Sequence, residues 1–159
     1  LSNVNAQGVD INLYNDWETS MMGLAGRDPL WRAKVSHEIL IDSAHAIALQ
    51  NKCTSCHAPA GHYQYFYHGG SAYTMDILAH DSLGLNGVSC GSCHEIGPAG
   101  LGTMFSGNIP YDTSHVEYGP FQNPEIGPMQ LYAGFIPTYS THMDESKLCS
   151  MSYTANKQR

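Results

Sequence analysis

Apolar residues recur at helical spacing mainly in the first half of the chain. Asp28 followed by Pro29 is typical of a helix start, because aspartate caps free backbone N–H groups and proline suits the first turn. The apolar positions that follow predict a helix over residues 29–40. Further helices are predicted over residues 43–52 and 71–80.

The rest of the chain predicts little regular structure. Residues 1–15 are polar and indicate an extended arm, and residues 97–141 are rich in glycine and proline and predict irregular loops. Asp144 can cap a short last helix that leads into Cys149. No segment alternates apolar and polar residues for long enough to predict a strand. The expected fold class is therefore mainly α with extensive irregular loops, in a single domain over residues 1–159.

Composition leaves this domain short of a conventional core. Leu, Ile, Val and Phe make up about 19% of the chain, near the level of about 20% below which a core is hard to build. Charged residues are only 13%, so the chain is not of the highly charged, disordered kind. We therefore expect something other than aliphatic side chains to complete the core. The net charge of −7 argues against nucleic-acid binding, and no apolar run is long enough for a transmembrane segment.

Four of the five cysteines lie in two segments, Cys-Thr-Ser-Cys-His and Cys-Gly-Ser-Cys-His. Cys-x-x-Cys-His is the attachment signature of c-type haem. Thiols separated by two residues reach the two vinyl groups of one porphyrin, and the next imidazole falls beneath the iron as its proximal ligand. The predicted attachment residues are Cys53, Cys56, Cys90 and Cys93, and the predicted proximal ligands are His57 and His94.

Other chemistry remains open for these cysteine pairs. A four-thiolate zinc site would use the same pairs but gives no reason for a histidine after both. A thioredoxin-like motif needs a βαβ frame, which the sequence does not predict. Simple disulfides are the third alternative. The pattern favours two covalent haems c, and because such thioether bonds form after export, a periplasmic or extracellular location is expected.

Short segments outside the motifs carry a family likeness: residues 17–22, 27–29, 86–96, 101–103, 118–121, 134–137 and 142–149. Together with the motifs they resemble bacterial multihaem c-type cytochromes of the cytochrome c-554 type. The resemblance implies a small multihaem cytochrome fold with closely packed, mostly bis-histidine haems that transfer electrons outside the cytoplasm. In that family the final Leu-Cys opens a third Cys-x-x-Cys-His motif, whereas Cys149 is followed here by Ser-Met-Ser-Tyr. We therefore expect no covalent third haem. Cys149 is expected to be a free thiol or to link two chains.

The tail over residues 150–159 has a genetic interpretation. Met151 to Ala155 can be encoded by codons that encode Cys-His-Thr-Leu when they are read one base later. This is how the family's third motif continues. The hypothesis is a frameshift near Ser150 that lost two bases and replaced the original C-terminus with Met151 to Arg159, and the nucleotide sequence tests it.

Distal iron ligands are expected among the remaining histidines. His45, His80 and His142 come first, because each lies seven to ten residues before a cysteine that opens a motif or its remnant. A methionine ligand is the competing choice and would raise the reduction potential. Lower-ranked candidates are His115, His37, His62 and His68 among the histidines, and Met21, Met22, Met104 and Met129 among the methionines.

The leading functional hypothesis is electron transfer through two bis-histidine, low-spin haems, without enzymatic activity. One alternative is a multihaem reductase with an open iron position. Another is a subunit of a larger assembly or filament, in which a histidine of one chain ligates the haem of the next. Expected partners are redox proteins, including other cytochromes or copies of itself, and the acidic charge favours basic docking surfaces.

Overall fold

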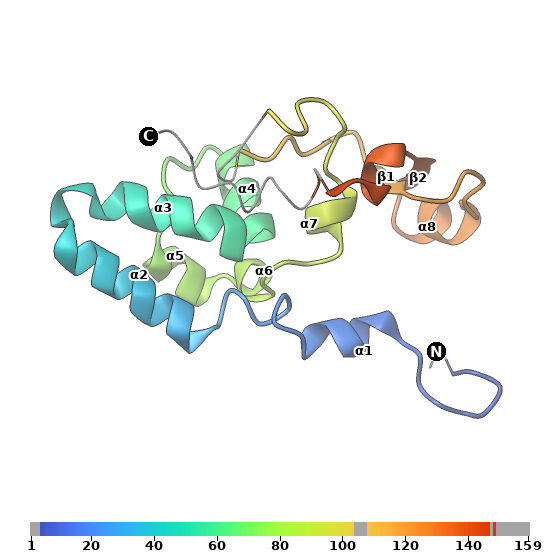
Figure 1. Ribbon diagram of the computed structural model, residues 1–159, viewed down its shortest axis with the longest axis horizontal. Coiled ribbons are helices and arrows are strands. Elements are labelled where there is room, and N and C mark those ends of the chain that lie inside the picture. The colour runs from blue at the N-terminus through green and yellow to red at the C-terminus, as the bar shows by residue number, and fades with distance from the viewer. Residues whose placement is uncertain (1–3, 104–107, 147, 149–159) are drawn as a thin grey trace. The chain divides into compact units, whose positions relative to one another are not determined.

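The computed structural model describes residues 4–103, 108–146 and 148 (Figure 1). Contacts group into two compact units, Leu1–Ser89 and Cys90–Arg159, and each unit holds one of the two motifs. Helices make up about half of the chain, with one short two-stranded sheet. A mainly α fold class is compatible with this structure, whereas the single domain over residues 1–159 stays a prediction.

The elements are named below in chain order. The first unit contains α1 (Leu13–Glu18), α2 (Pro29–Ile41), η1 (Ser43–His45), α3 (Ala46–His57), α4 (Pro59–Tyr67), α5 (Met75–His80) and α6 (Ser82–Leu85). The second unit contains α7 (Gly91–His94), β1 (Val116–Gly119), α8 (Gly127–Tyr132), β2 (Ile136–Tyr139) and η2 (Thr141–Asp144).

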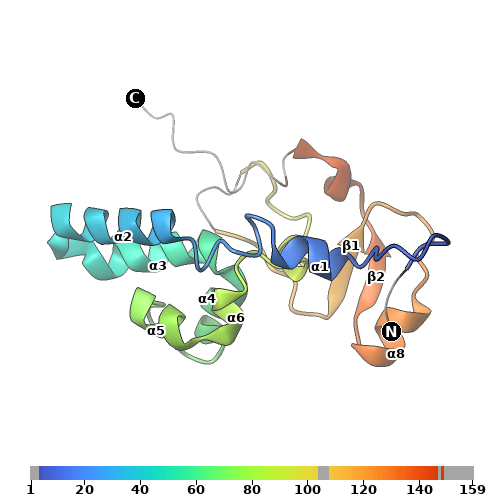
Figure 2. The same ribbon diagram turned by 90° about the horizontal axis from the view of Figure 1, so that it is seen from below.

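Helix α2 begins where the sequence predicts it. The Asp28 carboxylate accepts a hydrogen bond from the Leu30 N–H at 2.9 Å, and Pro29 occupies the first turn. Helix α3 packs alongside α2 in both views (Figure 1, Figure 2). The helix predicted over residues 43–52 starts as η1 and continues as α3 to His57. The helix is therefore longer than predicted, and it includes the whole first motif.

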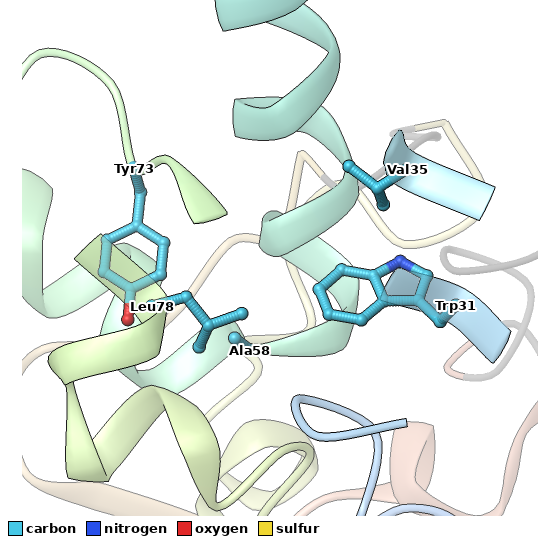
Figure 3. Packing of buried hydrophobic residues seen from close by; sticks show 5 residues of the cluster. All are labelled: Trp31, Val35, Ala58, Tyr73 and Leu78. Atoms are coloured by element: carbon cyan, nitrogen blue, oxygen red, sulfur yellow. The ribbon is translucent and has the colours of Figure 1, made fainter. Parts of the chain in front are cut away.

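A small apolar core lies among α2, α3, α4 and α5 (Figure 3). Val35 from α2 is almost fully buried, and Tyr73 and Leu78 before and on α5 are completely buried. Helix α4 packs so closely on α6 that a Cβ atom at Gly61 would lie 2.7 Å from the Gly84 Cα. The remaining members of the core cluster are Trp31 and Ala58.

The N-terminal segment differs from the predicted extended arm over residues 1–15. The Asn5 side chain accepts hydrogen bonds from the backbone N–H groups of Gln7 and Val9, both at 3.0 Å. This closes a turn of the kind that asparagine favours. The Asn12 side chain then caps α1, so the described part of the arm is folded rather than extended.

Two helices between the motifs also differ from the prediction. The helix predicted over residues 71–80 begins only at Met75, because the preceding Thr74 is extended and caps α5 with its hydroxyl. Helix α4 was not predicted, and it begins at Pro59, two residues after the first motif ends. Proline at a first helical turn, as at Pro29, was the available signal.

In the second unit, β1 and β2 pair in parallel, with Val116 opposite Ile136 and Gly119 opposite Tyr139. The prediction of no strand is wrong for these segments, and the irregular region over residues 97–141 also contains α8. Each strand has only four residues, too few to show an alternating pattern. Their pairing joins segments far apart in the chain, which local patterns do not reveal.

The C-terminal predictions fall at the edge of the described residues. Asp144, expected to cap a last helix, is instead the final residue of η2. Cys149 and the tail over residues 150–159 lie outside the described residues, as does Met104. Within the described ranges, no helix combines the length and apolar character needed to cross a membrane.

Candidate functional site

The first motif occupies about the last one and a half turns of α3 and is anchored to the core by Thr54, one of the two residues between its cysteines. Thr54 is fully buried, and its Oγ1 lies 3.0 Å from the Tyr73 carbonyl oxygen and 3.1 Å from His62 Nδ1. Cys53 and Cys56 lie three residues apart on the same helix and are both half-buried. The buried threonine therefore fixes the rotation of α3 that places both thiols.

His57, the last residue of α3, stacks against an indole ring. The Trp31 and His57 rings have centroids 4.4 Å apart and are inclined by 7°. The His57 Nδ1 atom is buried and has no hydrogen-bond partner among the described residues. Burial lowers the pKa of His57, while a hydrogen bond between the ring and the Ala25 backbone and, more weakly, the charge of the Asp28 carboxylate oppose that fall. The imidazole is therefore held neutral, as an iron ligand must be.

Burial also raises the pKa of the Cys53 thiol, and the nearby Cys56 and Glu38 add to this rise. Cys53 is therefore kept as a thiol rather than a thiolate at neutral pH. A thioether forms by addition of a thiol to a vinyl group, so Cys53 retains the group that this reaction would consume. The described cysteines Cys53, Cys56, Cys90 and Cys93 form no disulfide with one another.

The second motif forms the short helix α7 in the second unit. Cys90 is exposed at its N-cap and Cys93 is half-buried on it. Ser92 occupies the same place in its motif as Ser55, and both serines are buried. The Ser92 carbonyl oxygen accepts a hydrogen bond from the Tyr111 hydroxyl at 3.2 Å. In both motifs the serine therefore faces inward.

His94 has a defined partner. Its Nδ1 lies 2.6 Å from the Tyr118 carbonyl oxygen on β1. A carbonyl oxygen can only accept, so Nδ1 carries the proton and the Nε2 lone pair is available. Histidines that bind metals commonly donate the other ring N–H in this way. The Tyr118 hydroxyl in turn donates to Asp112 at 2.7 Å, which ties the strand to the preceding loop. His94 could therefore hold an iron through Nε2.

Two of the three preferred distal candidates are exposed and have the same tautomer. His45 Nδ1 lies 2.9 Å from both carboxylate oxygens of Asp42, and His80 Nδ1 lies 2.9 Å from the Asp76 carbonyl oxygen four residues earlier. In both, Nδ1 donates and the Nε2 lone pair is available for a ligand.

The third candidate, His142, is only 4% exposed and has partners at both ring nitrogens. Its Nε2 donates to the Ile96 carbonyl oxygen at 2.9 Å, and its Nδ1 accepts from the Ser140 hydroxyl at 2.6 Å. The ring also meets the edge of Tyr118, with centroids 5.1 Å apart. As an iron ligand, His142 would have to give up one of these hydrogen bonds.

The lower-ranked candidates are in diverse surroundings. His62 is buried in the aromatic cluster of α4, where burial lowers its pKa to about 4. His115 is exposed and has a positive φ of 60°, with its ring 5.6 Å from that of Phe135. Met21 is 89% exposed. His37 and Met22 are exposed too, while nothing is described of the Met129 side chain.

One cavity was not expected from the sequence. It has a volume of about 650 Å³ and is lined in part by His68 and His80. Like His80, His68 bonds the carbonyl oxygen four residues earlier, here that of Gln64 at 2.8 Å. In both imidazoles the Nε2 lone pair is therefore available. The available sequence signal was that each histidine lies four residues after another position of the same helical segment.

Within the part of the chain that the structure describes, no three His, Cys, Asp or Glu side chains gather into a group that could hold a metal ion. Each motif instead offers two thiols that could attach to a porphyrin and one imidazole that could bind its iron, so each motif could hold one haem. No family model, curated protein or solved structure matches the chain.

Proposed function

We propose that this chain carries two covalently attached haems c and transfers electrons. The repeated Cys-x-x-Cys-His motif carries the proposal, and the His94 tautomer, with Nε2 available, supports it. A bound haem would supply a one-electron Fe(III)/Fe(II) couple. The family likeness noted above favours the same function and an exported location, periplasmic or extracellular.

The cysteines and the histidines of the motifs have distinct roles in this proposal. Cys53 and Cys56 hold one porphyrin and Cys90 and Cys93 the other, each through two thioether bonds. His57 and His94 are the proximal ligands. The Tyr118 carbonyl fixes the His94 tautomer and ring orientation.

For the distal positions, the proposal favours His45 and His80 over His142. Both exposed imidazoles already donate from Nδ1, so ligation through Nε2 requires no lost hydrogen bond. The Asp42 carboxylate behind His45 would also strengthen that imidazole as a donor.

Intact-protein mass tests the proposal directly. For this test, the full chain is expressed with an export signal in a bacterium that attaches c-type haem. The mass of the product should exceed that of the polypeptide by two haems. Pairwise replacement by alanine at Cys53 and Cys56 should remove one haem, whereas Cys149→Ala should remove none. A protein without covalent haem, or with a third, would contradict the proposal.

A second candidate is a subunit whose exposed histidines ligate iron in a neighbouring chain. The exposure of His45, His68 and His80, each with an available Nε2, favours it. Light scattering of the haem-loaded protein separates the two: a monomer with low-spin irons supports ligation within one chain. Carbon monoxide binding to the reduced protein would indicate an open iron, as in a reductase.

A further inference from the structure

Strand β1 packs against α7, the short helix of the second motif (Figure 1). Toward β2, the Gly119 carbonyl oxygen accepts a hydrogen bond from the Ser140 N–H at 3.0 Å. Successive carbonyl groups of a strand point to opposite edges, so the Tyr118 carbonyl faces away from β2. In the part of the chain that the structure describes, the sheet has two strands, and His94 Nδ1 supplies the donor at this open edge, at 2.6 Å.

Asp112 ties this edge to the chain that leaves the second motif. Its backbone N–H donates to the carbonyl oxygen of Glu95, the residue after His94, at 2.7 Å. Its carboxylate oxygen Oδ2 accepts from the Tyr118 hydroxyl at 2.7 Å. Because the Tyr118 carbonyl in turn binds His94, the contacts form a closed ring through four residues.

The other carboxylate oxygen of Asp112 orients its side chain. Oδ1 accepts from the Ser114 backbone N–H at 2.9 Å and also from the Ser114 hydroxyl. Aspartate favours turns of this kind. The hydrogen bonds from Ser114 and Tyr118 hold the pKa of the Asp112 carboxyl below its ordinary value, so the carboxylate is ionised at neutral pH and only accepts. The Tyr118 hydroxyl is therefore the donor in its contact with Asp112.

Tyr118 is also restrained at its ring. The His142 ring meets the edge of the Tyr118 ring, with centroids 5.1 Å apart, and its Nε2 donates to the Ile96 carbonyl oxygen at 2.9 Å. His142 thus contacts the Tyr118 ring and the chain beyond Glu95. Asp112 is the residue that joins the Tyr118 hydroxyl directly to the peptide group next to the proximal ligand.

We propose that Asp112 is a positioning residue for the proximal ligand of the second haem, and that it holds the Tyr118 carbonyl against His94 Nδ1. The inference rests on the proposed function, because it concerns how His94 binds iron. A hydrogen bond from Nδ1 to a carbonyl orients a ligating imidazole and strengthens Nε2 as a donor. Asp112 acts on the ligand through Tyr118 and Glu95.

Solvent exchange of the His94 Nδ1 proton tests the inference, by NMR of the reduced, haem-loaded full chain with nitrogen-15 histidine. The variant with alanine at Cys90 and Cys93, which should lack the second haem, identifies the signal. Asp112→Ala and Tyr118→Phe break the same contact from its two sides, and each should raise the exchange rate by about tenfold, as expected for the loss of one charge-assisted hydrogen bond. Asp112→Asn keeps an oxygen that accepts from the Tyr118 hydroxyl, so its rise should stay below about threefold.

Two references separate positioning from a general loss of structure. Glu125→Gln removes the charge of an exposed carboxylate in the same unit and should leave the exchange rate unchanged. The Ser140 backbone N–H, bonded to Gly119 at the other edge of β1, should keep its own exchange rate in every variant. Combining Asp112→Ala with Tyr118→Phe should give no larger rise than either change alone, because both remove one contact.

Unchanged exchange at His94 in Asp112→Ala and Tyr118→Phe would overturn the inference. An equal rise at the Ser140 N–H would overturn it too, because the sheet as a whole would then have loosened. If Asp112→Ala fails to fold or to take up the second haem, Tyr118→Phe, which removes a single hydroxyl, decides alone. Failure of the proposed function is distinct, since it would appear as the absence of two haems in the mass of the unaltered chain.

Discussion

Replacing Thr54 by valine removes one buried hydroxyl at the first motif while keeping the shape of the side chain. The hydroxyl lies within 3.1 Å of the Tyr73 carbonyl oxygen and of His62 Nδ1. It can accept from the imidazole N–H, while its single proton is shared between the Tyr73 carbonyl and the carbonyls of Gln50 and Asn51, at 2.9 and 3.1 Å. Valine would leave both buried groups without this partner.

The cost follows from those two groups. A buried polar group left without a partner costs about 1–3 kcal/mol, so the loss at two groups should lower the free energy of unfolding of Thr54→Val by about 2–6 kcal/mol. For a chain of this size, that corresponds to a fall in melting temperature of about 4–24 °C. Thr54→Ser keeps the hydroxyl and loses one methyl group, which costs only about 1 kcal/mol.

Urea unfolding of the haem-loaded protein, followed by far-ultraviolet circular dichroism, measures both variants. The dependence of the unfolding free energy on urea should stay unchanged, so that only the midpoint moves. The order of the two variants decides between explanations. If the serine variant were less stable than the valine variant, Thr54 would act through packing and the hydrogen-bond argument would be refuted.

Three further outcomes are expected. With alanine at all four motif cysteines, the chain should lose haem and show no cooperative thermal transition; a cooperative melt would contradict the view that haem completes the core. Burial lowers the pKa of His62 to about 4, below the value of about 6.5 of an unfolded histidine, so the unfolded chain takes up the proton first as the pH falls. Stability should therefore decrease between about pH 6.5 and pH 4, by about 2–3 kcal/mol, and urea unfolding of His62→Gln should show a shallower decrease. Tyr73 donates to Asp81 at 2.5 Å, so Tyr73→Phe should cost about 1.5–3 kcal/mol in the same assay, while the exposed control Tyr67→Phe should cost less than about 0.5 kcal/mol.

The parts of the fold that the sequence predicts depend on local signals. Helix α2 starts at its Asp-Pro cap because that signal lies within three residues. Helix α3 was predicted too short, because the Thr-Ser pair of the motif favours helix only weakly. The buried contacts of Thr54 with Tyr73, which lies 19 residues later, compensate for that weak preference. Strands β1 and β2 depend wholly on a distant partner and were missed.

The candidate site divides in the same way. The sequence alone predicts the thiols and imidazoles of the motifs, because haem attachment depends on the spacing of these residues along the chain. It does not reveal that His94 donates to a carbonyl 24 residues later, or that His57 stacks on an indole from another helix. Tautomers and ring contacts depend on long-range packing, so they become visible only in the folded chain.

The low aliphatic content of the chain bears on the haem-free prediction. The core of the first unit is small, and on α2 the large apolar side chains Leu30 and Leu40 are 78% and 82% exposed. Two covalent porphyrins would add flat apolar surface, which the exposed side chains of α2 do not provide for one another. If the four-cysteine variant nevertheless melted cooperatively, the small core would be sufficient by itself. The composition would then give no support to a cofactor, and the proposal would rest on the motifs and the His94 geometry alone.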